Sequence, residues 1–432
     1  MDAEFHGSVP DWLRGTLLRN GPGLWQLGTH EVQHWFDGLA KLHAFHLDGS
    51  RVRYRSRFLR SPEWQGLQQK GRLTHPQFAS DPCRSLFKKF TSMFLPEVGC
   101  NANVNITRLG ERFLALTETP LALEFDPETL ETIGLYDYGG DGFRGPITSA
   151  HPQLEEGTLF NFTVCLGKQS SYRGYHTRQG PRQEFARAAT RRPSYLHSCA
   201  LNAEAMMLWE GPLVVDPLQL LWREKPYIQN YRWRPELGSR AIALGRDGAV
   251  SYHELPPRFV FHLVQSFSSA GETVLDMLAY PNAEVIDQLY LQPLLCGGAV
   301  AMPVLTRVRG TSLEVLSDTP LELPRVIEPP GQPYAAVFGI SREQGPFYDA
   351  LARIEPESGR TRKWYEAGCY PGEPVPVASP CGRERLLLSV VLDSAREQSF
   401  LLVLEADTLQ ERARAYVPAV VPFGFHGGFL FS

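Results

Sequence analysis

The chain has 432 residues, of which 43% are hydrophobic and 21% are charged, as in ordinary globular proteins. The 43 basic and 47 acidic residues leave a formal net charge of −4, which argues against nucleic acid as a partner. The sequence has no run of about 18 apolar residues and no N-terminal signal pattern, so we expect a cytoplasmic protein without a membrane-spanning helix.

Most of the chain consists of short apolar or alternating runs separated by turn residues, a pattern typical of β-strands. Helical periodicity is confined to residues 84–95 and to residues 282–291, where Asn282 is the expected N-cap. The clearest strand candidates are residues 51–59, 112–119, 159–165, 205–210, 259–266, 273–280, 304–308, 334–340, 386–392 and 400–404.

A similar acidic turn lies between predicted strands at residues 125–131, 354–359 and 404–410. Such turns occur in many β proteins, but hairpins repeated along the whole length, without a flexible linker, favour one closed architecture. We therefore predict an all-β propeller that forms one domain over residues 1–432, with a pair of β-sandwiches as the structural alternative.

Histidine is the most promising metal ligand in this sequence. The seven cysteines are widely spaced and lack a Cys-X-X-Cys pair, which favours free thiols in a reducing cytoplasm. Of the 12 histidines, we interpret three in an aromatic stretch as core residues: His34, His43 and His46. Five others are interpreted as structural or surface residues: His6, His30, His75, His176 and His253.

The four remaining histidines have mostly apolar neighbours next to predicted strands: His151, His197, His262 and His426. They are 46, 65 and 164 residues apart, which matches no short metal motif but suits a propeller whose blades each send one residue to the axis. Four neutral imidazoles with open coordination positions suit iron better than a closed zinc site. The alternative is that these are hydrogen-bonded core histidines.

Several ordered motifs spread over nearly the whole chain resemble the carotenoid cleavage oxygenase family. This family includes β-carotene oxygenases, apocarotenoid oxygenases and the vertebrate retinoid isomerohydrolase. The motifs lie at residues 18–23 (LRNGPG), 34–38 (HWFDG), 117–119 (TET), 126–132 (DPETLET), 233–235 (WRP), 322–325 (ELPR), 372–374 (GEP) and 424–427 (GFHG).

The resemblance implies a seven-bladed β-propeller with a cap of helices and loops over an axial Fe(II) site. The four histidines would be the catalytic metal ligands: His151, His197, His262 and His426. Three glutamates would accept their remaining ring N–H groups: Glu118, Glu322 and Glu373. The implied reaction uses O2 to split a conjugated double bond of a carotenoid or apocarotenoid, such as β-carotene, into aldehydes. Retinoid isomerisation and non-enzymatic binding of an apolar ligand are the alternatives.

Residues 81–95 combine an apolar helical face with basic residues, as expected for a helix that lies on a membrane surface. The alternative is a surface helix packed on the protein itself. The segment resembles the membrane-binding segment of animal relatives, in which the matching cysteine can be acylated. We expect a peripheral membrane contact through five residues: Cys83, Leu86, Phe87, Phe90 and Phe94.

Three positions depart from patterns seen in relatives. Stilbenoid-cleaving relatives have a lysine where this chain has Thr117, which disfavours a phenolic substrate. Cys199 replaces a larger apolar residue, and the segment after His262 lacks the usual Asn-Ala pair. The exact polyene, the cleaved bond and the oligomeric state stay open at this point.

Overall fold

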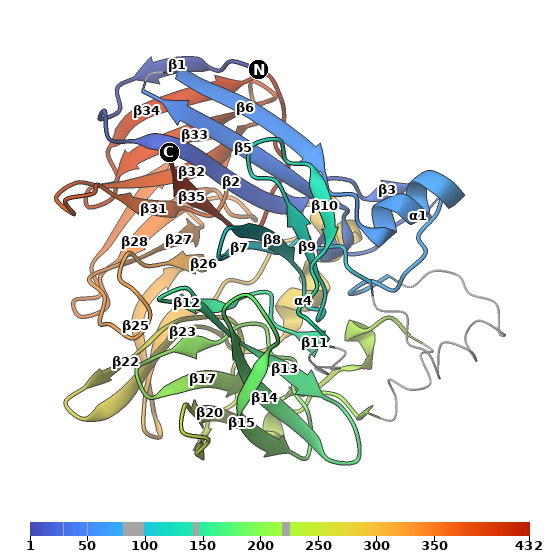
Figure 1. Ribbon diagram of the computed structural model, residues 1–432. Helices are drawn as coiled ribbons and strands as arrows, with labels where there is room; N and C mark the ends of the chain where they lie inside the picture. Colours follow the sequence, from blue (N-terminus) through green and yellow to red (C-terminus); the bar gives the residue numbers. More distant parts are fainter. Residues whose placement is uncertain (29, 50, 81–98, 141–146, 218–224) are drawn as a thin grey trace.

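A computed structural model describes residues 1–28, 30–49, 51–80, 99–140, 147–217 and 225–432 (Figure 1). In this part of the chain, seven antiparallel sheets form the blades of a β-propeller, which confirms the predicted fold. The sandwich alternative is wrong. That the whole chain forms one domain stays a prediction.

The blades follow one another along the chain, and each contains four to six strands. The first blade contains β35 (Gly427–Phe431), β2 (Arg14–Pro22), β5 (Ala40–Asp48) and β6 (Arg51–Phe58). The second contains β7 (Asn105–Leu109), β8 (Arg112–Leu116), β9 (Ala122–Phe125) and β10 (Thr132–Leu135). The third contains β11 (Ile147–Thr148), β12 (Gln153–Glu155), β13 (Thr158–Cys165), β14 (Ser170–Thr177) and β15 (Gln183–Thr190). The fourth contains β16 (Ala200–Leu201), β17 (Ala205–Glu210), β20 (Ser239–Gly245) and β21 (Val250–Leu255).

The other three blades complete the ring. The fifth contains β22 (Phe259–Ser269), β23 (Glu272–Tyr280), β24 (Val304–Arg309) and β25 (Ser312–Pro320). The sixth contains β26 (Glu322–Arg325), β27 (Val337–Ser341), β28 (Ala350–Ile354) and β29 (Thr361–Tyr365). The seventh contains β30 (Cys369–Pro371), β31 (Val375–Ala378), β32 (Arg385–Asp393), β33 (Gln398–Glu405), β34 (Glu411–Val417) and β1 (Glu4–Gly7). Two small ribbons lie outside the blades: β3 (Gln26–Leu27) with β4 (His30–Glu31), and β18 (Leu213–Val214) with β19 (Arg232–Trp233).

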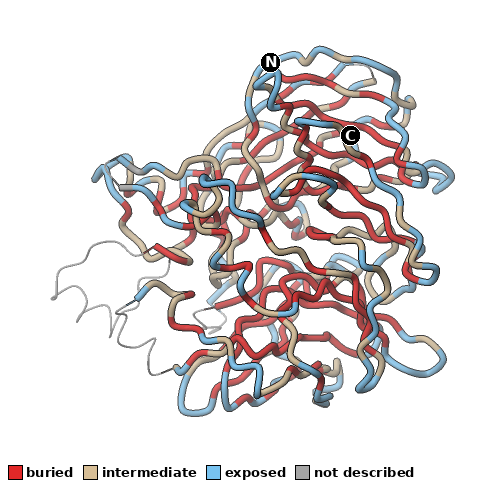
Figure 2. The backbone as a smooth tube through the Cα atoms, turned by 180° about the vertical axis from the view of Figure 1, so that it is seen from behind, coloured by how far each residue is buried: buried red, intermediate tan, exposed pale blue. Residues whose placement is uncertain are grey.

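Both chain ends close the ring. The C-terminal strand β35 pairs with β2 of the first blade, and the N-terminal strand β1 pairs with β34 of the seventh. The two termini therefore lie in adjacent blades at the same end of the molecule (Figure 1). Buried residues concentrate in the blade strands, while the connecting turns are exposed (Figure 2).

The three acidic turns form hairpins, as their sequences predicted, and they share one backbone conformation. Each connects two adjacent strands of a blade, and its sixth residue has a positive φ: 61° at Leu130, 65° at Gly359 and 58° at Leu409. The amide of that residue donates to the carbonyl four residues earlier in all three turns. The repeat is therefore a structural device of the outer hairpins.

Helices are short in the described residues and lie outside the blades. They comprise α1 (Pro62–Lys70), α4 (Glu284–Gln288), α5 (Leu291–Leu295), η1 (Trp35–Asp37), η2 (Ile228–Asn230) and η3 (Pro235–Leu237). None of the helices seen in these residues has the length and apolar content needed to cross a membrane. The predicted helix at residues 84–95 lies outside the described part of the chain.

The prediction of one continuous helix over residues 282–291 is wrong. Asn282 accepts a hydrogen bond from the Glu284 amide (3.0 Å), but α4 ends at Gln288. The chain then extends, because Tyr290 forms an antiparallel bridge with His34 and the Leu289 carbonyl accepts from the Trp35 amide (3.1 Å). These long-range bonds to the η1 segment end the helix one turn early.

The predicted strands are found, with differences at their ends. β8 ends at Leu116, before the predicted limit of 119, and β27 begins at Val337 where a start at residue 334 was predicted. Of the three histidines predicted in the core, His34 and His43 are fully buried. His46 is only half-buried, and its ring contacts the Thr16 hydroxyl on the neighbouring strand β2 (3.1 Å).

Candidate metal centre and pocket

Four buried histidines from four blades come together where the inner ends of the blades meet. His151 lies between β11 and β12, His197 precedes β16, His262 lies within β22, and His426 immediately precedes β35. The His151 ring centre lies 4.5 Å from that of His197, 5.0 Å from that of His262 and 4.5 Å from that of His426. The four predicted histidines span 275 positions of the sequence, from His151 to His426, and lie together in one cluster.

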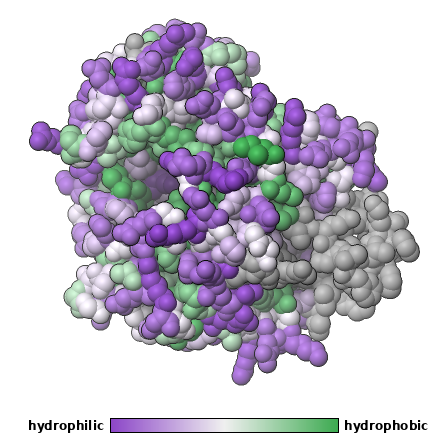
Figure 3. Space-filling view, in the orientation of Figure 1, coloured by the Kyte–Doolittle hydropathy of each residue, from purple (hydrophilic) through white to green (hydrophobic). Residues whose placement is uncertain are grey.

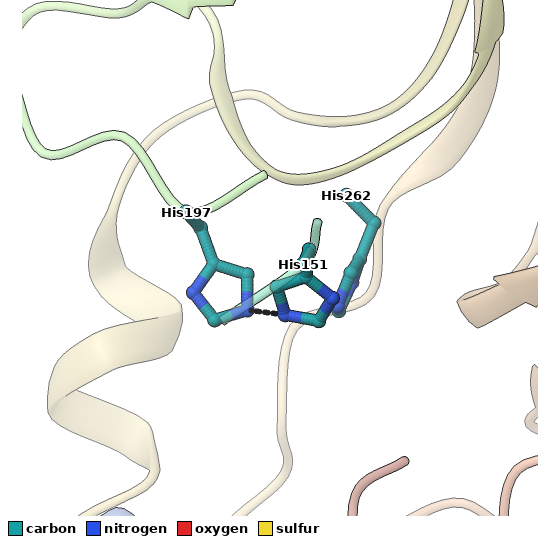
Figure 4. Close-up of side chains that lie close together, drawn as sticks. All are labelled: His151, His197 and His262. Carbon is teal, nitrogen blue, oxygen red and sulfur yellow. Dashed lines mark hydrogen bonds between the residues drawn. The ribbon is translucent and has the colours of Figure 1, made fainter. Parts of the chain in front are cut away.

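Three of these histidines meet the geometric requirement for a shared metal ion. One ligand nitrogen from each of His151, His197 and His262 lies within 4.8 Å of the other two (Figure 4). The Nε2 atoms of His151 and His197 face each other at 2.9 Å. The Nε2 atom of His262 is buried and has no hydrogen-bond partner. An unpartnered buried nitrogen is costly, so this arrangement fits a cation held between the rings.

Three carboxylates hold three of the rings from behind. Glu118 accepts from Nδ1 of His197 (2.6 Å), Glu322 from Nδ1 of His262 (2.6 Å) and Glu373 from Nδ1 of His426 (2.7 Å). A carboxylate is an acceptor only, so each contact places the proton on Nδ1 and leaves the Nε2 lone pair free. The three predicted glutamates therefore lie where they can orient metal ligands.

Each of the seven blades contributes one residue to this set. Glu118 follows β8 of the second blade, Glu322 begins β26 of the sixth, and Glu373 lies between β30 and β31 of the seventh. The four histidines come from the first, third, fourth and fifth blades. A ring of blades thus brings together residues that are far apart in sequence.

Burial favours the neutral form of His151 and His426, which is the form that binds a metal. Desolvation lowers the pKa of His426 to about 4, and desolvation followed by the neighbouring imidazoles lowers the pKa of His151 well below its usual value. Burial alone would raise the pKa of Glu322, but His262 and the backbone outweigh it and lower that pKa. Neutral imidazoles backed by carboxylates suit a divalent metal with nitrogen ligands.

Hydrogen bonds between neighbouring blades fix the backbone of the ligands. The Ser149 hydroxyl donates to the His197 carbonyl (2.6 Å) and accepts from the His151 amide (2.9 Å). The Ser198 hydroxyl donates to the Phe261 carbonyl (2.8 Å). The Asn105 side chain donates to the Ala150 carbonyl (2.9 Å). These hydrogen bonds connect the second blade to the third, the third to the fourth and the fourth to the fifth beside the cluster.

Sequence reasoning did not assign roles to four residues that contact the glutamates. Tyr195 donates to Glu118 (2.8 Å) and Tyr280 donates to Glu322 (2.9 Å), whereas Glu373 pairs with Arg19 and Arg325. The arginines fall within recognised motifs, and Tyr195 lies two residues before His197, which is the signal that could have found them. Tyr280 offers no comparable local signal.

A pocket opens directly onto the cluster. His197, His262 and His426 line one wall. The remaining wall is mainly aromatic and aliphatic: Trp35, Phe36, Phe78, Val104, Phe261, Tyr280, Leu289, Leu323, Ile340, Tyr348 and Phe425. Thr117 lies in the lining, and no lysine or arginine does among the described residues. Hydrophilic side chains dominate much of the outer face shown in Figure 3, in contrast to this interior.

Segments that cap the pocket are held by a buried aspartate. Asp37 in η1 accepts from the Ala79 amide (3.2 Å) and the Ser80 hydroxyl (2.7 Å), which fixes the segment that carries Phe78. The predicted membrane-contact residues begin just after this segment and lie outside the described part of the chain: Cys83, Leu86, Phe87, Phe90 and Phe94.

Gly427 is a sensitive position beside the cluster. A methyl group there would overlap the Leu18 carbonyl oxygen, and the Gly427 amide donates to Glu373 (3.1 Å). We expect Gly427→Ala to lower the free energy of unfolding by about 1–3 kcal/mol and to reduce metal uptake by displacing His426. Urea unfolding and metal content check this. Gly428→Ala, where nothing lies within 4 Å, is the matched control; equal behaviour of the two variants would contradict the prediction.

Comparison with known proteins agrees with this geometry. Residues 1–430 match the family model described as RPE65, retinal pigment epithelial membrane protein. The chain is 27% identical to mouse (Mus musculus) β,β-carotene 15,15'-dioxygenase, covering 100% of this chain and 89% of the relative. It is 29% identical to a mitochondrial carotenoid-cleaving dioxygenase from Pongo abelii, covering 100% and 92%. A cobalt-substituted Synechocystis ACO structure has the same fold, with a TM-score of 0.88 at 24% identity over 100% of this chain and 96% of that one.

Proposed function

We propose, from the premise that this chain belongs to the RPE65 family, that it is a non-haem Fe(II) dioxygenase cleaving a carotenoid or apocarotenoid. The products would be aldehydes, as from β-carotene to retinal. The observation that carries the proposal is the cluster of four buried histidines, three of them backed by glutamates, facing an aromatic pocket. Relatives named as carotenoid-cleaving dioxygenases support the substrate class.

The residues of this chain divide the task between them. Iron, when bound, would supply the activation of O2. His151, His197, His262 and His426 would hold it. In the last three, Nδ1 is hydrogen-bonded to a glutamate, so the lone pair of Nε2 is free to bind the metal. The aromatic wall would exclude water and hold a polyene against the cluster.

The pocket lining favours a hydrocarbon segment over a charged or phenolic ligand. Thr117 stands where a lysine would be needed to hold a phenol, and no cation lines the described pocket. The hydroxyl group of Tyr280 donates to Glu322, so its proton is not available to a polar end group. This supports a conjugated hydrocarbon chain passing the metal.

Access to a lipid-soluble polyene would come from a membrane surface. The basic, Phe-rich sequence at residues 81–95 supports peripheral association of a cytoplasmic protein, with Cys83 as the residue matching the acylated cysteine of a relative. In sequence, these residues directly follow the segment that Asp37 holds through the Ala79 amide. That segment also contains Phe78, which lines the pocket.

An oxygen-labelling experiment tests the function. We expect anaerobically purified, iron-loaded protein to convert β-carotene or an apocarotenal into aldehydes that carry label from 18O2, as measured by mass spectrometry with rapid trapping. Iron-free protein is the control and should give no product. Oxygen-independent turnover of a retinyl ester would instead favour an isomerase, and binding of polyenes without any product would favour a non-enzymatic propeller.

A further inference from the structure

The three glutamates behind the histidines differ in how their negative charge is balanced. Glu118 accepts from the Tyr195 hydroxyl, and Glu322 accepts from the Tyr280 hydroxyl and the Leu323 amide, all of which are neutral donors. Glu373 is paired with two guanidinium groups and also accepts from a backbone amide. The asymmetry is a property of charge, since the three glutamate–histidine distances are 2.6, 2.6 and 2.7 Å.

The two arginines are built into the site. The Arg19 side chain is 5% exposed and that of Glu373 is 0% exposed. Arg325 Nε donates to Glu373 (2.8 Å), and a second nitrogen of its guanidinium donates to the Gly427 carbonyl (2.6 Å). Arg19 also donates to the Phe425 carbonyl (2.6 Å), so the pair holds the backbone on both sides of His426.

A carboxylate strengthens the histidine it contacts by attracting the Nδ1 proton, which makes the opposite nitrogen a better donor. Positive groups on the same carboxylate weaken that effect, because they compete for its negative charge. The two guanidinium charges also repel a nearby divalent cation. His426 therefore has a weaker electrostatic support than His197 or His262.

We propose that Arg19 and Arg325 are positioning residues that make His426 the weakest of the three carboxylate-backed metal donors. The inference rests on the proposed function, because it assumes that the cluster binds a divalent metal. Its consequence is specific in sign: removing one of the two positive charges strengthens metal binding. A purely structural role for the arginines predicts the reverse.

Cobalt titration of the metal-free protein against a competing chelator tests the sign. We expect Arg325→Gln, which keeps a hydrogen-bonding group and removes the charge, to bind Co²⁺ roughly tenfold more tightly. Arg325→Lys should restore the affinity of the unsubstituted protein. The visible bands of bound Co²⁺ should stay the same in all variants, which shows that the same histidines bind it.

Arg414→Gln is the matched control, because Arg414 is also partly buried and pairs with two carboxylates, Glu366 and Glu411, on outer strand β34. It should leave the affinity unchanged. Equal or weaker binding by Arg325→Gln would overturn the inference. If that variant does not fold, Arg325→Met makes the same prediction with a neutral side chain of similar length. Absence of Co²⁺ binding by the unsubstituted protein would instead overturn the metal centre of the proposed function.

Discussion

Replacing His262 with alanine is expected to remove the metal and to lower polyene cleavage by about a thousandfold or more. The reason lies in the surroundings of its ring. Nε2 is buried and unpartnered, while Nδ1 contacts Glu322 at 2.6 Å. No other described polar group forms a hydrogen bond with this nitrogen, and a bound cation would supply the missing partner.

Metal content by mass spectrometry and product formation under O2 measure the effect. His43→Asn is the control, because His43 is as buried as His262 but contacts Tyr54 (2.7 Å) and lies outside the cluster. It should keep its metal. Full metal content and activity in the His262→Ala protein would show that the histidines are core residues without a catalytic role.

Glu322→Gln should give a smaller effect at the same position. The amide can still contact Nδ1 of His262, but it lacks the charge that stabilises the ring and the metal. We expect metal affinity to fall by about 10–100-fold, with the fold intact by circular dichroism. A larger loss of metal affinity in His262→Ala than in Glu322→Gln would separate the role of the histidine from that of the carboxylate behind it.

The propeller and the histidines and glutamates of the cluster were predicted from different kinds of sequence evidence. Strands were found from alternation and turn residues, which are local properties, and the three acidic turns have the same conformation. The glutamates could be selected only through the family resemblance, and the four histidines, singled out by their apolar neighbours, became firm metal-ligand predictions only through it. Their spacing alone left buried core histidines as an alternative, because blade order, not sequence distance, brings them together.

Contacts that depend on long-range pairing were not accessible in this way. The break after Gln288 comes from a bridge between Tyr290 and His34, which are distant in sequence. The partner of Glu373 is likewise Arg19, at the other end of the chain. Local periodicity contains no record of such contacts, so both the helix end and the charge asymmetry required the structure.

Acid sensitivity of the metal-free protein is the second large effect that we expect. Burial lowers the pKa of His34 to about 4, that of His43 to about 3 and that of His426 to about 4, and His151 shifts in the same direction. At about pH 5 the imidazoles of His34, His43 and His426 are neutral in the folded chain, but they take up protons on unfolding, where the pKa is about 6.5. Their protonation therefore favours the unfolded chain as the pH falls.

Asp37 acts in the opposite direction. Burial raises its pKa to about 7 from the usual 3.8, so at about pH 5 it is protonated when folded and ionised when unfolded. Three histidines, His34, His43 and His426, less one aspartate leave an excess of about two protons in the unfolded state. The free energy of unfolding should therefore fall by about 3 kcal/mol per pH unit between about pH 6 and about pH 5, and the lowered pKa of His151 acts in the same direction.

Urea unfolding of the metal-free protein across this range gives the slope directly. His43→Asn removes one of the neutral buried imidazoles, so it should reduce the slope by about 1.4 kcal/mol per pH unit. His253→Asn, at an exposed position, should leave it unchanged. A slope near zero, or equal slopes for His43→Asn and the unsubstituted protein, would contradict the prediction. A slope of the expected size would show that the fold holds its buried imidazoles neutral even without metal, which is the protonation state that a metal-binding cluster needs.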